Sequence, residues 1–236
     1  MKALIFAAGL GTRLRPLTAT TPKPLLHVGG KPLLQWHIER LVSAGIHDII
    51  INSAWLAEAI DQYVSGAPVR GARLQVSFEP DGPYDTGGAI RHVRAQLGEQ
   101  PFLAIAGDIW TLMPFEPLLE RGLKDHELGC LALVPNPVQH PGGDFCRHSN
   151  GVLSRESTGE WFTYSGISLL RAALIDRFDE QCFPLREPLR QAAEQGALAG
   201  EVWRGDWEDV GTIERYQALN ARLAVSAAVR SDRSGA

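Results

Sequence analysis

Residues 3–18 of the chain read ALIFAAGLGTRLRPLT, and this stretch decides the fold. Its first part, Ala3–Ala8, is an unbroken apolar run that ends in glycine, which is typical of a parallel strand buried on both faces of a sheet. A glycine-rich loop then begins at Gly9. Open α/β sheets bind their ligands at the carboxyl ends of such strands. The stretch therefore predicts a ligand site at the first strand-to-helix turn of an α/β fold.

Strands and helices alternate from this loop to about residue 110. Apolar runs predict strands, and apolar residues at helical spacing predict helices, in the order helix 33–44, strand 48–52, helix 56–64, strand 74–78, helix 87–97 and strand 102–106. This alternation favours a doubly wound parallel sheet with right-handed crossovers.

The pattern becomes mixed after residue 110. The sequence predicts helices over 115–123, 172–178 and 185–194, and strands over 128–134, 145–148, 152–154, 164–170 and 198–203. The dipeptide Asn150-Gly151 is typical of a turn between antiparallel strands. Thr212 can cap a last helix that ends near Leu223, and the small, polar and charged residues 224–236 predict a flexible tail. We therefore expect a single α/β domain with a mixed sheet.

The composition limits the classes of protein to which the chain can belong. Of its 236 residues, 44% are hydrophobic and 21% are charged, as in globular proteins. A net charge of −4 offers no polycationic surface, so we expect neither a nucleic-acid nor a membrane partner. Cys130, Cys146 and Cys182 lack metal-site or disulfide-framework spacing. The apolar run after Met1 is too short for a signal peptide, which predicts a cytoplasmic protein with small-molecule substrates. The sequence carries no signal for an oligomeric state.

The loop after the first strand combines glycine with fixed positive charge. Gly9 and Gly11 allow backbone N–H groups to approach an anion, and Arg13 would add a guanidinium. Lys23, which lies between two prolines, would bring a second cation to a triphosphate. The loop lacks both the Walker A pattern and the third glycine of the Rossmann GxGxxG pattern. A plain glycine-rich turn with surface cations is the alternative, and the full combination disfavours it.

Two further segments belong to the predicted crevice. Asp108 follows the strand at 102–106, so its carboxylate should reach the crevice, where a hard oxygen ligand beside a phosphate suits Mg²⁺. Alternatively, Asp108 caps the next helix. Thr86 and Gly87 open a helix, which would let a planar base pack against bare backbone near helix N-terminal donors. Glu79 could accept a hydrogen bond from the N3–H of uracil or thymine, or it could be an ordinary exposed carboxylate.

The motif GLGTRLRPLT, followed by PKP at 22–24, resembles the signature of the sugar-1-phosphate nucleotidyltransferases. The resemblance implies a Rossmann-like, glycosyltransferase-A-type fold over 1–223. In that fold the nucleotide-binding half would cover about 1–110 and the sugar-phosphate half about 111–223.

The same resemblance implies roles for individual residues. The nucleotide would contact Gly9, Gly11, Thr12, Arg13, Lys23, Thr86 and Gly87. Arg13 would hold the β- and γ-phosphates, Lys23 would lie near the α-phosphate, and both would act in catalysis with Asp108. Asp209, in the sequence WEDVGT, is similar to the second metal aspartate of the family, so Asp108 and Asp209 would hold Mg²⁺. Asp206 and Glu208 lie nearby but outside this role.

The distal half resembles one branch of that family. Asn136-Pro137, His140, GGDF at 142–145 and YSGI at 164–167 are similar to the branch that transfers a uridylyl group from UTP to N-acetylmuramic acid α-1-phosphate in bacterial peptidoglycan recycling. Asp144 and Tyr164 would bind the sugar, and Gly142 and Gly143 would leave room for it. Asp144 could also be a turn residue. Ala106 departs from the family, which often carries Asn before Gly-Asp.

Two alternatives stay open at this point. The same chemistry could join mannose 1-phosphate to GTP, or glucose 1-phosphate to dTTP or UTP. A catalytically inactive sensor of sugar nucleotides is the other alternative, and the retention of both cations and both aspartates disfavours it. His37, His92 and His126 lie outside these motifs, so we expect core or surface roles for them.

Overall fold

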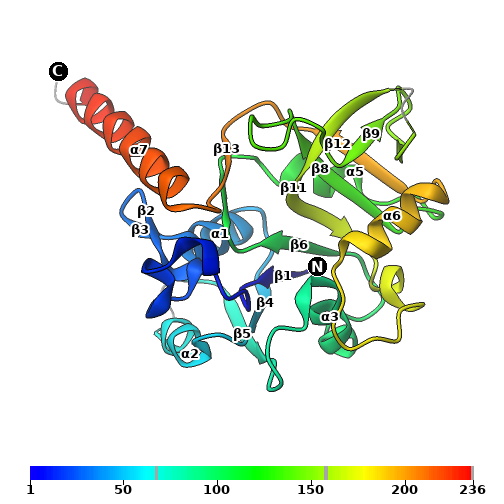
Figure 1. Ribbon diagram of the computed structural model, residues 1–236, viewed down its shortest axis with the longest axis horizontal. Coiled ribbons are helices and arrows are strands. Elements are labelled where there is room, and N and C mark those ends of the chain that lie inside the picture. Colours follow the sequence, from blue (N-terminus) through cyan, green and yellow to red (C-terminus); the bar gives the residue numbers. More distant parts are fainter. Residues whose placement is uncertain (67–68, 157–158, 235–236) are drawn as a thin grey trace.

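The computed structural model describes residues 1–66, 69–156 and 159–234. Within these residues the chain forms one large mixed sheet flanked by helices (Figure 1). The strands of this sheet are β1 (Lys2–Phe6), β4 (Asp48–Ser53), β5 (Arg73–Phe78), β6 (Phe102–Ala106), β8 (Gly129–Val134), β9 (Phe145–Arg147), β10 (Leu153–Ser154), β11 (Glu160–Leu170) and β12 (Leu198–Val202).

The order of the strands explains why the sheet is mixed. Strand β1 pairs in parallel with both β4 and β6, and β5 extends the parallel part beyond β4. On the other side of β6, strand β11 runs antiparallel, and it pairs in turn with β8 and β9. The predicted α/β fold class with a doubly wound mixed sheet is confirmed. Because β6 and β11 are hydrogen-bonded neighbours, the sheet continues across residue 110 without a domain boundary.

Helices cover both faces of this sheet. One face carries α1 (Leu33–Ser43), α2 (Ala57–Ser65) and α5 (Glu116–Arg121), and the other carries α3 (Asp85–His92), α4 (Arg94–Leu97) and α6 (Arg186–Glu194). A hydrophobic core lies between the sheet and the helices on each face, and alternate residues of β1 contribute to the two cores. Ala3 and Ile5 face α1, α2 and α5, whereas Leu4 faces α3, α4 and α6. The unbroken apolar run of β1 therefore serves two cores at once.

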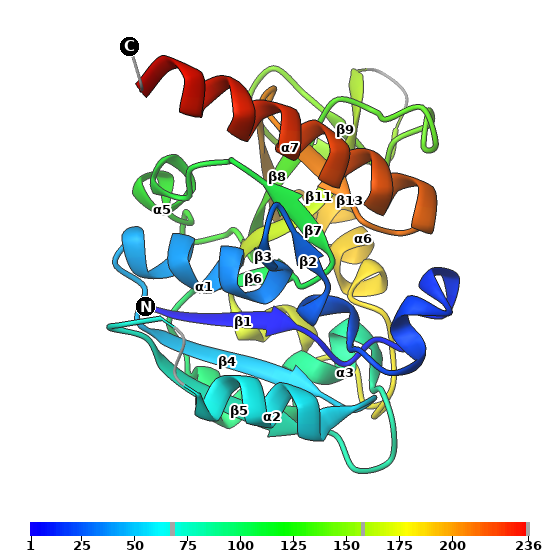
Figure 2. The same ribbon diagram turned by 90° about the vertical axis from the view of Figure 1, so that its left-hand side faces the viewer.

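Two small sheets and the last helix complete the fold. Strand β2 (His27–Val28) pairs with β3 (Lys31–Pro32), and β7 (Ile109–Thr111) pairs with β13 (Trp207–Asp209). Helix α7 (Ile213–Ser234) docks on them through a small cluster formed by Val28, Leu33, Trp110, Val210 and Leu219. Figure 2 shows α7 and α2 at opposite ends of the molecule. None of the described helices combines the length and the apolar character that a bilayer crossing requires.

Several element boundaries differ from the predictions. Helix α7 does not end at Leu223, where we expected a tail to begin, because 224–234 contain neither Gly nor Pro to stop it. The helix expected over 87–97 is divided at Val93 into α3 and α4. The helix expected over 172–178 is a short 3-10 helix, Ala172–Ile175, and β11 begins four residues before the expected Tyr164.

Candidate functional site

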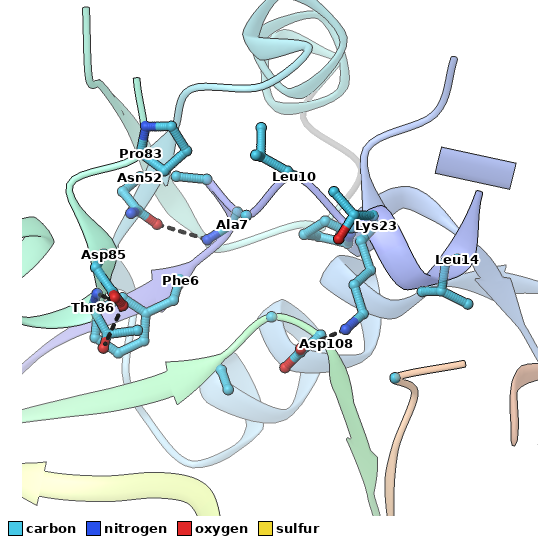
Figure 3. Close-up of a pocket in the computed structure, with 18 of the residues that line it drawn as sticks. Phe6, Ala7, Leu10, Leu14, Lys23, Asn52, Pro83, Asp85, Thr86 and Asp108 are labelled. Carbon is cyan, nitrogen blue, oxygen red and sulfur yellow. Dashed lines mark hydrogen bonds and ion pairs between the residues drawn. The ribbon is translucent and has the colours of Figure 1, made fainter. Parts of the chain in front are cut away.

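A cavity of about 480 Å³ opens at the carboxyl ends of β1 and β6. Figure 3 shows Lys23 and Asp108 at one end of it and Asp85 and Thr86 at the other. The cavity thus lies at the edge of the sheet that the sequence predicted. Four segments and several single residues line it, namely 6–14, 23–24, 85–86 and 106–108 together with Asn52, Pro83, Cys182 and Gly211.

The glycine-rich loop forms one wall of this cavity. After β1 it continues into a 3-10 helix, Thr12–Leu14, whose Leu14 is buried in the core. Gly11 has a φ of 60°, and a Cβ there would lie 2.9 Å from Cγ2 of Thr18, whose hydroxyl donates to the Gly11 carbonyl over 2.7 Å. Glycine is therefore required at 11 by both backbone angle and space. Gly9, Gly11, Thr12 and Arg13 all line the cavity, as predicted.

Asn52 fixes the start of the loop. It is the penultimate residue of the parallel strand β4, where its Oδ1 accepts a hydrogen bond of 2.6 Å from the Ala7 backbone N–H. Its Nδ2 donates to Oε1 of Glu79 over 2.8 Å, and Oε2 of Glu79 accepts from the Tyr84 N–H, also over 2.8 Å. Asn52 was not among the residues predicted from the sequence, although a polar residue near the carboxyl end of a buried parallel strand is a signal for a site residue.

Glu79 does not occupy the position that the sequence suggested. Only 1% of the residue is exposed, and both of its oxygens are used by Asn52 and Tyr84. Burial raises the pKa of this carboxyl. Glu79 lies outside the residues that line the cavity, so it positions Asn52 instead of accepting from a base.

The two predicted cations differ in their surroundings. Lys23 is 9% exposed in the 3-10 helix Lys23–Leu25, and its Nζ lies 2.5 Å from Oδ2 of Asp108. The side chain of Asp108 is 39% exposed, and the residue lines the cavity. Arg13 is exposed, and within the described part of the chain its side chain makes no hydrogen bond or ion pair. The guanidinium of Arg13 is thus available to an anion in the cavity.

Asp209 lies beside Asp108 through backbone pairing. Asp209 is opposite Ile109 in the β7–β13 pair, and the Val210 N–H donates to the Asp108 carbonyl over 3.0 Å. Oδ2 of Asp209 accepts from Arg215 over 2.9 Å. Asp209 itself does not line the cavity, but Gly211 does, and a Cβ on Gly211 would lie 2.1 Å from Nη2 of Arg215 and 3.0 Å from Oδ1 of Asp209.

This donor set fits a hard divalent cation. The described residues contain no group of three or more His, Cys, Asp and Glu side chains arranged for a metal. One or two carboxylates together with waters and phosphate oxygens are nevertheless the ligands that Mg²⁺ accepts. Asp108 and Asp209 each have one oxygen without a protein cation on it, so the two aspartates could share such an ion.

The first turn of α3 brings one of the two residues predicted to bind the base, Thr86, to the cavity. Thr86 lines the cavity, and Asp85 beside it has a φ of 60°. Gly87 does not line the cavity, because a Cβ there would lie 2.3 Å from the ring of Phe183. The N–H groups of Gly87 and Gly88 both donate to the Phe183 carbonyl. Gly87 therefore packs α3 against the 181–183 segment, and it lies outside the cavity lining where we expected a base to meet it.

A second cavity of about 230 Å³ adjoins the first. Phe6, Thr86 and Ala106 line both cavities, so the two share a wall. The departure at Ala106 falls on this wall, where a longer side chain such as Asn would take space from both. The remaining lining residues come from β9, β11 and α6, and from Asp144 and Leu185, which directly precede β9 and α6.

The predicted sugar residues both reach this second cavity. Asp144 accepts from the Tyr164 N–H over 2.8 Å and lies 3.1 Å from Nε2 of His140. The hydroxyl of Tyr164 is 2.8 Å from Oγ of Ser168, and burial raises the pKa of this phenol. Gly142 and Gly143 do not line the cavity, contrary to our expectation, and a Cβ on Gly143 would meet Asn136 at 2.7 Å.

The three histidines lie outside the lining of both cavities, as expected. His37 is buried in α1, and burial lowers its pKa to about 4, against the opposite effect of nearby Asp108. It is therefore uncharged at neutral pH. His92 and His126 are on the surface.

Comparison with known proteins gives consistent similarities. Residues 2–143 match the family described as nucleotidyl transferase. The chain is 39% identical to the N-acetylmuramate alpha-1-phosphate uridylyltransferase of Neisseria meningitidis, over 94% of this chain and 97% of that one. It is 29% identical to the protein of the same name from Caulobacter vibrioides, over 94% and 96% of the two chains. The structure resembles a putative glucose-1-phosphate thymidylyltransferase from Bacillus anthracis, with a TM-score of 0.79, 21% identity and coverage of 94% and 95%.

Proposed function

Because the chain belongs to the sugar-1-phosphate nucleotidyltransferase family, we propose that it transfers a uridylyl group from UTP to N-acetylmuramic acid α-1-phosphate. The products are UDP-N-acetylmuramic acid and pyrophosphate. The observation that carries this proposal is a pair of adjoining cavities, one with a phosphate-binding type of loop and one lined by Asp144 and Tyr164. The identity of the two substrates rests on the name of the Neisseria relative.

The larger cavity suits the nucleotide. The triphosphate would lie along the loop at 9–13, with Arg13 on the β- and γ-phosphates and Lys23 near the α-phosphate. The base would lie toward Asn52 and Thr86, at the other end of the cavity. In this arrangement Lys23 exchanges part of its contact with Asp108 for a phosphate oxygen.

The reaction is an in-line displacement at phosphorus. A phosphate oxygen of the sugar 1-phosphate attacks the α-phosphorus of UTP, and the bond from that phosphorus to the bridging oxygen of the β-phosphate breaks as pyrophosphate leaves. The attacking oxygen is already ionised at neutral pH, so no general base is needed. Positioning and charge neutralisation supply most of the catalysis in such transfers. Arg13 and Lys23 would stabilise the charge that develops on pyrophosphate.

A divalent cation belongs to this proposal. When bound, Mg²⁺ would neutralise charge between the two anionic substrates, and Asp108 and Asp209 are the residues that would hold it. The cytoplasm is the proposed compartment and peptidoglycan recycling the proposed role. The three cysteines are free thiols, the state that a reducing compartment maintains.

A panel of substrates tests the proposal. UTP, dTTP and GTP are each combined with the 1-phosphates of N-acetylmuramic acid, glucose and mannose, and pyrophosphate release is measured with Mg²⁺. UTP with the muramic acid phosphate should give the highest kcat/KM. A higher value for GTP with mannose 1-phosphate, or for glucose 1-phosphate with dTTP or UTP, would reject the substrate assignment but keep the reaction. Binding without turnover of any pair would favour the sensor instead.

A further inference from the structure

We propose that Arg186 and Arg190 form the subsite that recognises a carboxylate on the sugar and so select an acidic sugar phosphate over a neutral one. Both residues lie on α6 and line the second cavity. This inference rests on the function proposed above, because it concerns the sugar that this cavity would hold. Neither arginine was singled out by the sequence.

The two guanidinium groups converge on one position. Arg186 and Arg190 are four residues apart on a helix, so their side chains share a face. Nε of Arg186 lies 3.2 Å from Oε1 of Glu187, and Nη1 of Arg190 lies 3.7 Å from the same oxygen. A single carboxylate oxygen is thus within reach of both cations. One carboxylate can therefore contact both groups; that carboxylate is Glu187, outside the cavity lining, and a substrate carboxylate in the cavity would draw on the same two cations.

The two arginines carry more positive charge than the one acidic residue beside them neutralises, so a second anion could bind there. Glu187 is one negative charge against two positive charges, and it does not line the cavity. Asp144 is the acidic residue of the cavity lining, and its oxygens face the Tyr164 N–H and His140 instead of the arginines. Apart from these charged groups the walls are largely apolar or aromatic, including Phe6 and Phe145. A neutral sugar would have no group for the two arginines, whereas a carboxylate on the sugar would pair with both.

The phosphate of the sugar is the competing ligand for these cations. The attack on the α-phosphorus must occur near Lys23 and Asp108, which line the first cavity and not the second. Arg186 and Arg190 line the second cavity and not the first. A sugar that spans the shared wall would therefore place its phosphate toward Lys23 and its ring substituents toward α6.

Two sugar phosphates that differ only in the lactyl group, which carries the carboxylate, separate these possibilities. N-acetylmuramic acid 1-phosphate carries a lactyl ether on the 3-oxygen, and N-acetylglucosamine 1-phosphate has a hydroxyl there. kcat/KM is measured for both, at saturating UTP, with wild type, Arg186→Ala, Arg190→Ala and the double variant. Arg177→Ala is the control, because it removes one exposed positive charge next to the opposite face of α6.

We expect each single variant to lose about tenfold or more on the acidic sugar and to stay within about twofold on the neutral one, because a charged hydrogen bond is lost with the first only. Activity on the neutral sugar also shows that the variants are folded. Equal losses on both sugars, or no loss on either, would overturn the inference and leave the proposed function standing. A wild-type enzyme without preference for the acidic sugar would instead reject the proposed substrate, and the inference with it.

Discussion

Lys23 and Asp108 form an ion pair that holds two predicted catalytic groups in place before a substrate binds. The Nζ–Oδ2 distance is 2.5 Å, and Lys23 is 9% exposed. A lysine so far removed from water requires an anionic partner. Asp108 supplies it in the structure described here, and in the proposed reaction a phosphate oxygen would take over part of that contact. The pair therefore keeps a buried cation ready for the nucleotide without leaving it unpaired.

Lys23→Ala tests this role. Turnover should fall by at least about a hundredfold, the scale for loss of one preorganised charge-stabilising group. The melting temperature should change little, because the Asp108 side chain is 39% exposed and water can solvate it. Pyrophosphate release and thermal melting measure the two effects. Lys31→Ala, which removes a lysine from an ion pair with Glu39, is the control and should keep its activity. Loss of the fold in Lys23→Ala, or normal turnover, would contradict the prediction.

A second prediction for single residues concerns the two aspartates proposed to bind Mg²⁺. Asp108→Asn and Asp209→Asn should each lower turnover by at least about a hundredfold, because an amide is a poor substitute for a carboxylate as a Mg²⁺ ligand. The dependence of rate on Mg²⁺ concentration should also shift upward. Asp206→Asn is the control, since Asp206 lies in the same segment as Asp209, has no predicted metal role and is paired only loosely with Arg222 at 3.8 Å. An aspartate whose Asn variant shows ordinary Mg²⁺-dependent turnover is not a ligand.

Secondary-structure elements bring the site together through short pairings. The β7–β13 ladder is only three residues long, yet it places Asp209 next to Asp108 across about a hundred residues of sequence. The end of β4 does the same for Asn52 and the loop after β1. Asn52 is thus held by the central sheet, whereas Asp209 is held by a separate two-stranded sheet whose strand β7 follows β6 along the chain.

The contact between α5 and the turn before β8 makes the stability of the protein depend on pH. The end of α5 is joined to the turn before β8 by two hydrogen bonds of 2.8 Å from Arg121 to Glu127, whose side chain is 4% exposed. These bonds to the guanidinium hold the pKa of Glu127 below its ordinary value. A depressed carboxyl pKa contributes stability that is present above the unfolded pKa, about 4.3 for Glu, and is lost as the pH falls through the folded value.

Glu127→Gln should therefore destabilise the protein by about 1.5–3 kcal/mol at pH 7, the range for hydrogen bonds to charged groups. The difference from wild type should shrink as the pH falls below about 4, because Glu127 then becomes protonated. Urea unfolding at several pH values measures both. Glu201→Gln is the matched control, since Glu201 contacts the same arginine at 3.3 Å but is 50% exposed. A difference between wild type and Glu127→Gln that is equal at all pH values would contradict this account.

Elements also show what local sequence can predict. The strands β1, β4 and β6 lie within two residues of their predicted ends, because burial on both faces requires unbroken apolar runs. The end of α7 was missed because no Gly or Pro marks it before residue 235. The cavity lining at 9–13, 23 and 108 was predicted correctly from the strand–loop pattern.

The errors at the site have a different origin. Gly87 was predicted to meet a base, but it meets Phe183, which lies 96 residues further along the chain. Glu79 was considered for the base, but Asn52 and Tyr84 use both of its oxygens. Arg186 and Arg190 carry no motif, and only the packing of α6 brings them to the second cavity. These roles depend on distant tertiary neighbours, which local patterns do not contain.

In the molecule as a whole, the predicted nucleotide-binding half and the predicted sugar-phosphate half contribute strands to the same sheet. The predicted boundary near residue 110 lies between β6 and β8, yet β11 from the second half is hydrogen-bonded to β6 from the first. Leu4 and Phe102 from the first half share a core with Leu131 and Leu189 from the second. Both cavities also draw residues from the two halves. Folding and ligand binding should therefore involve the whole chain.

Because the two halves share one sheet, we predict a single unfolding transition. A bound nucleotide should stabilise the whole chain against unfolding. Urea unfolding followed by far-UV circular dichroism and by tryptophan fluorescence should give coincident curves, and Trp36 and Trp203 place reporters in both halves. Mg²⁺ with UTP at about a hundred times its Kd should add about 2.7 kcal/mol to the free energy of unfolding, because it binds only the folded chain. Both probes should report the same increase. Two separate transitions, or a nucleotide effect confined to one of them, would show that the halves fold as independent units.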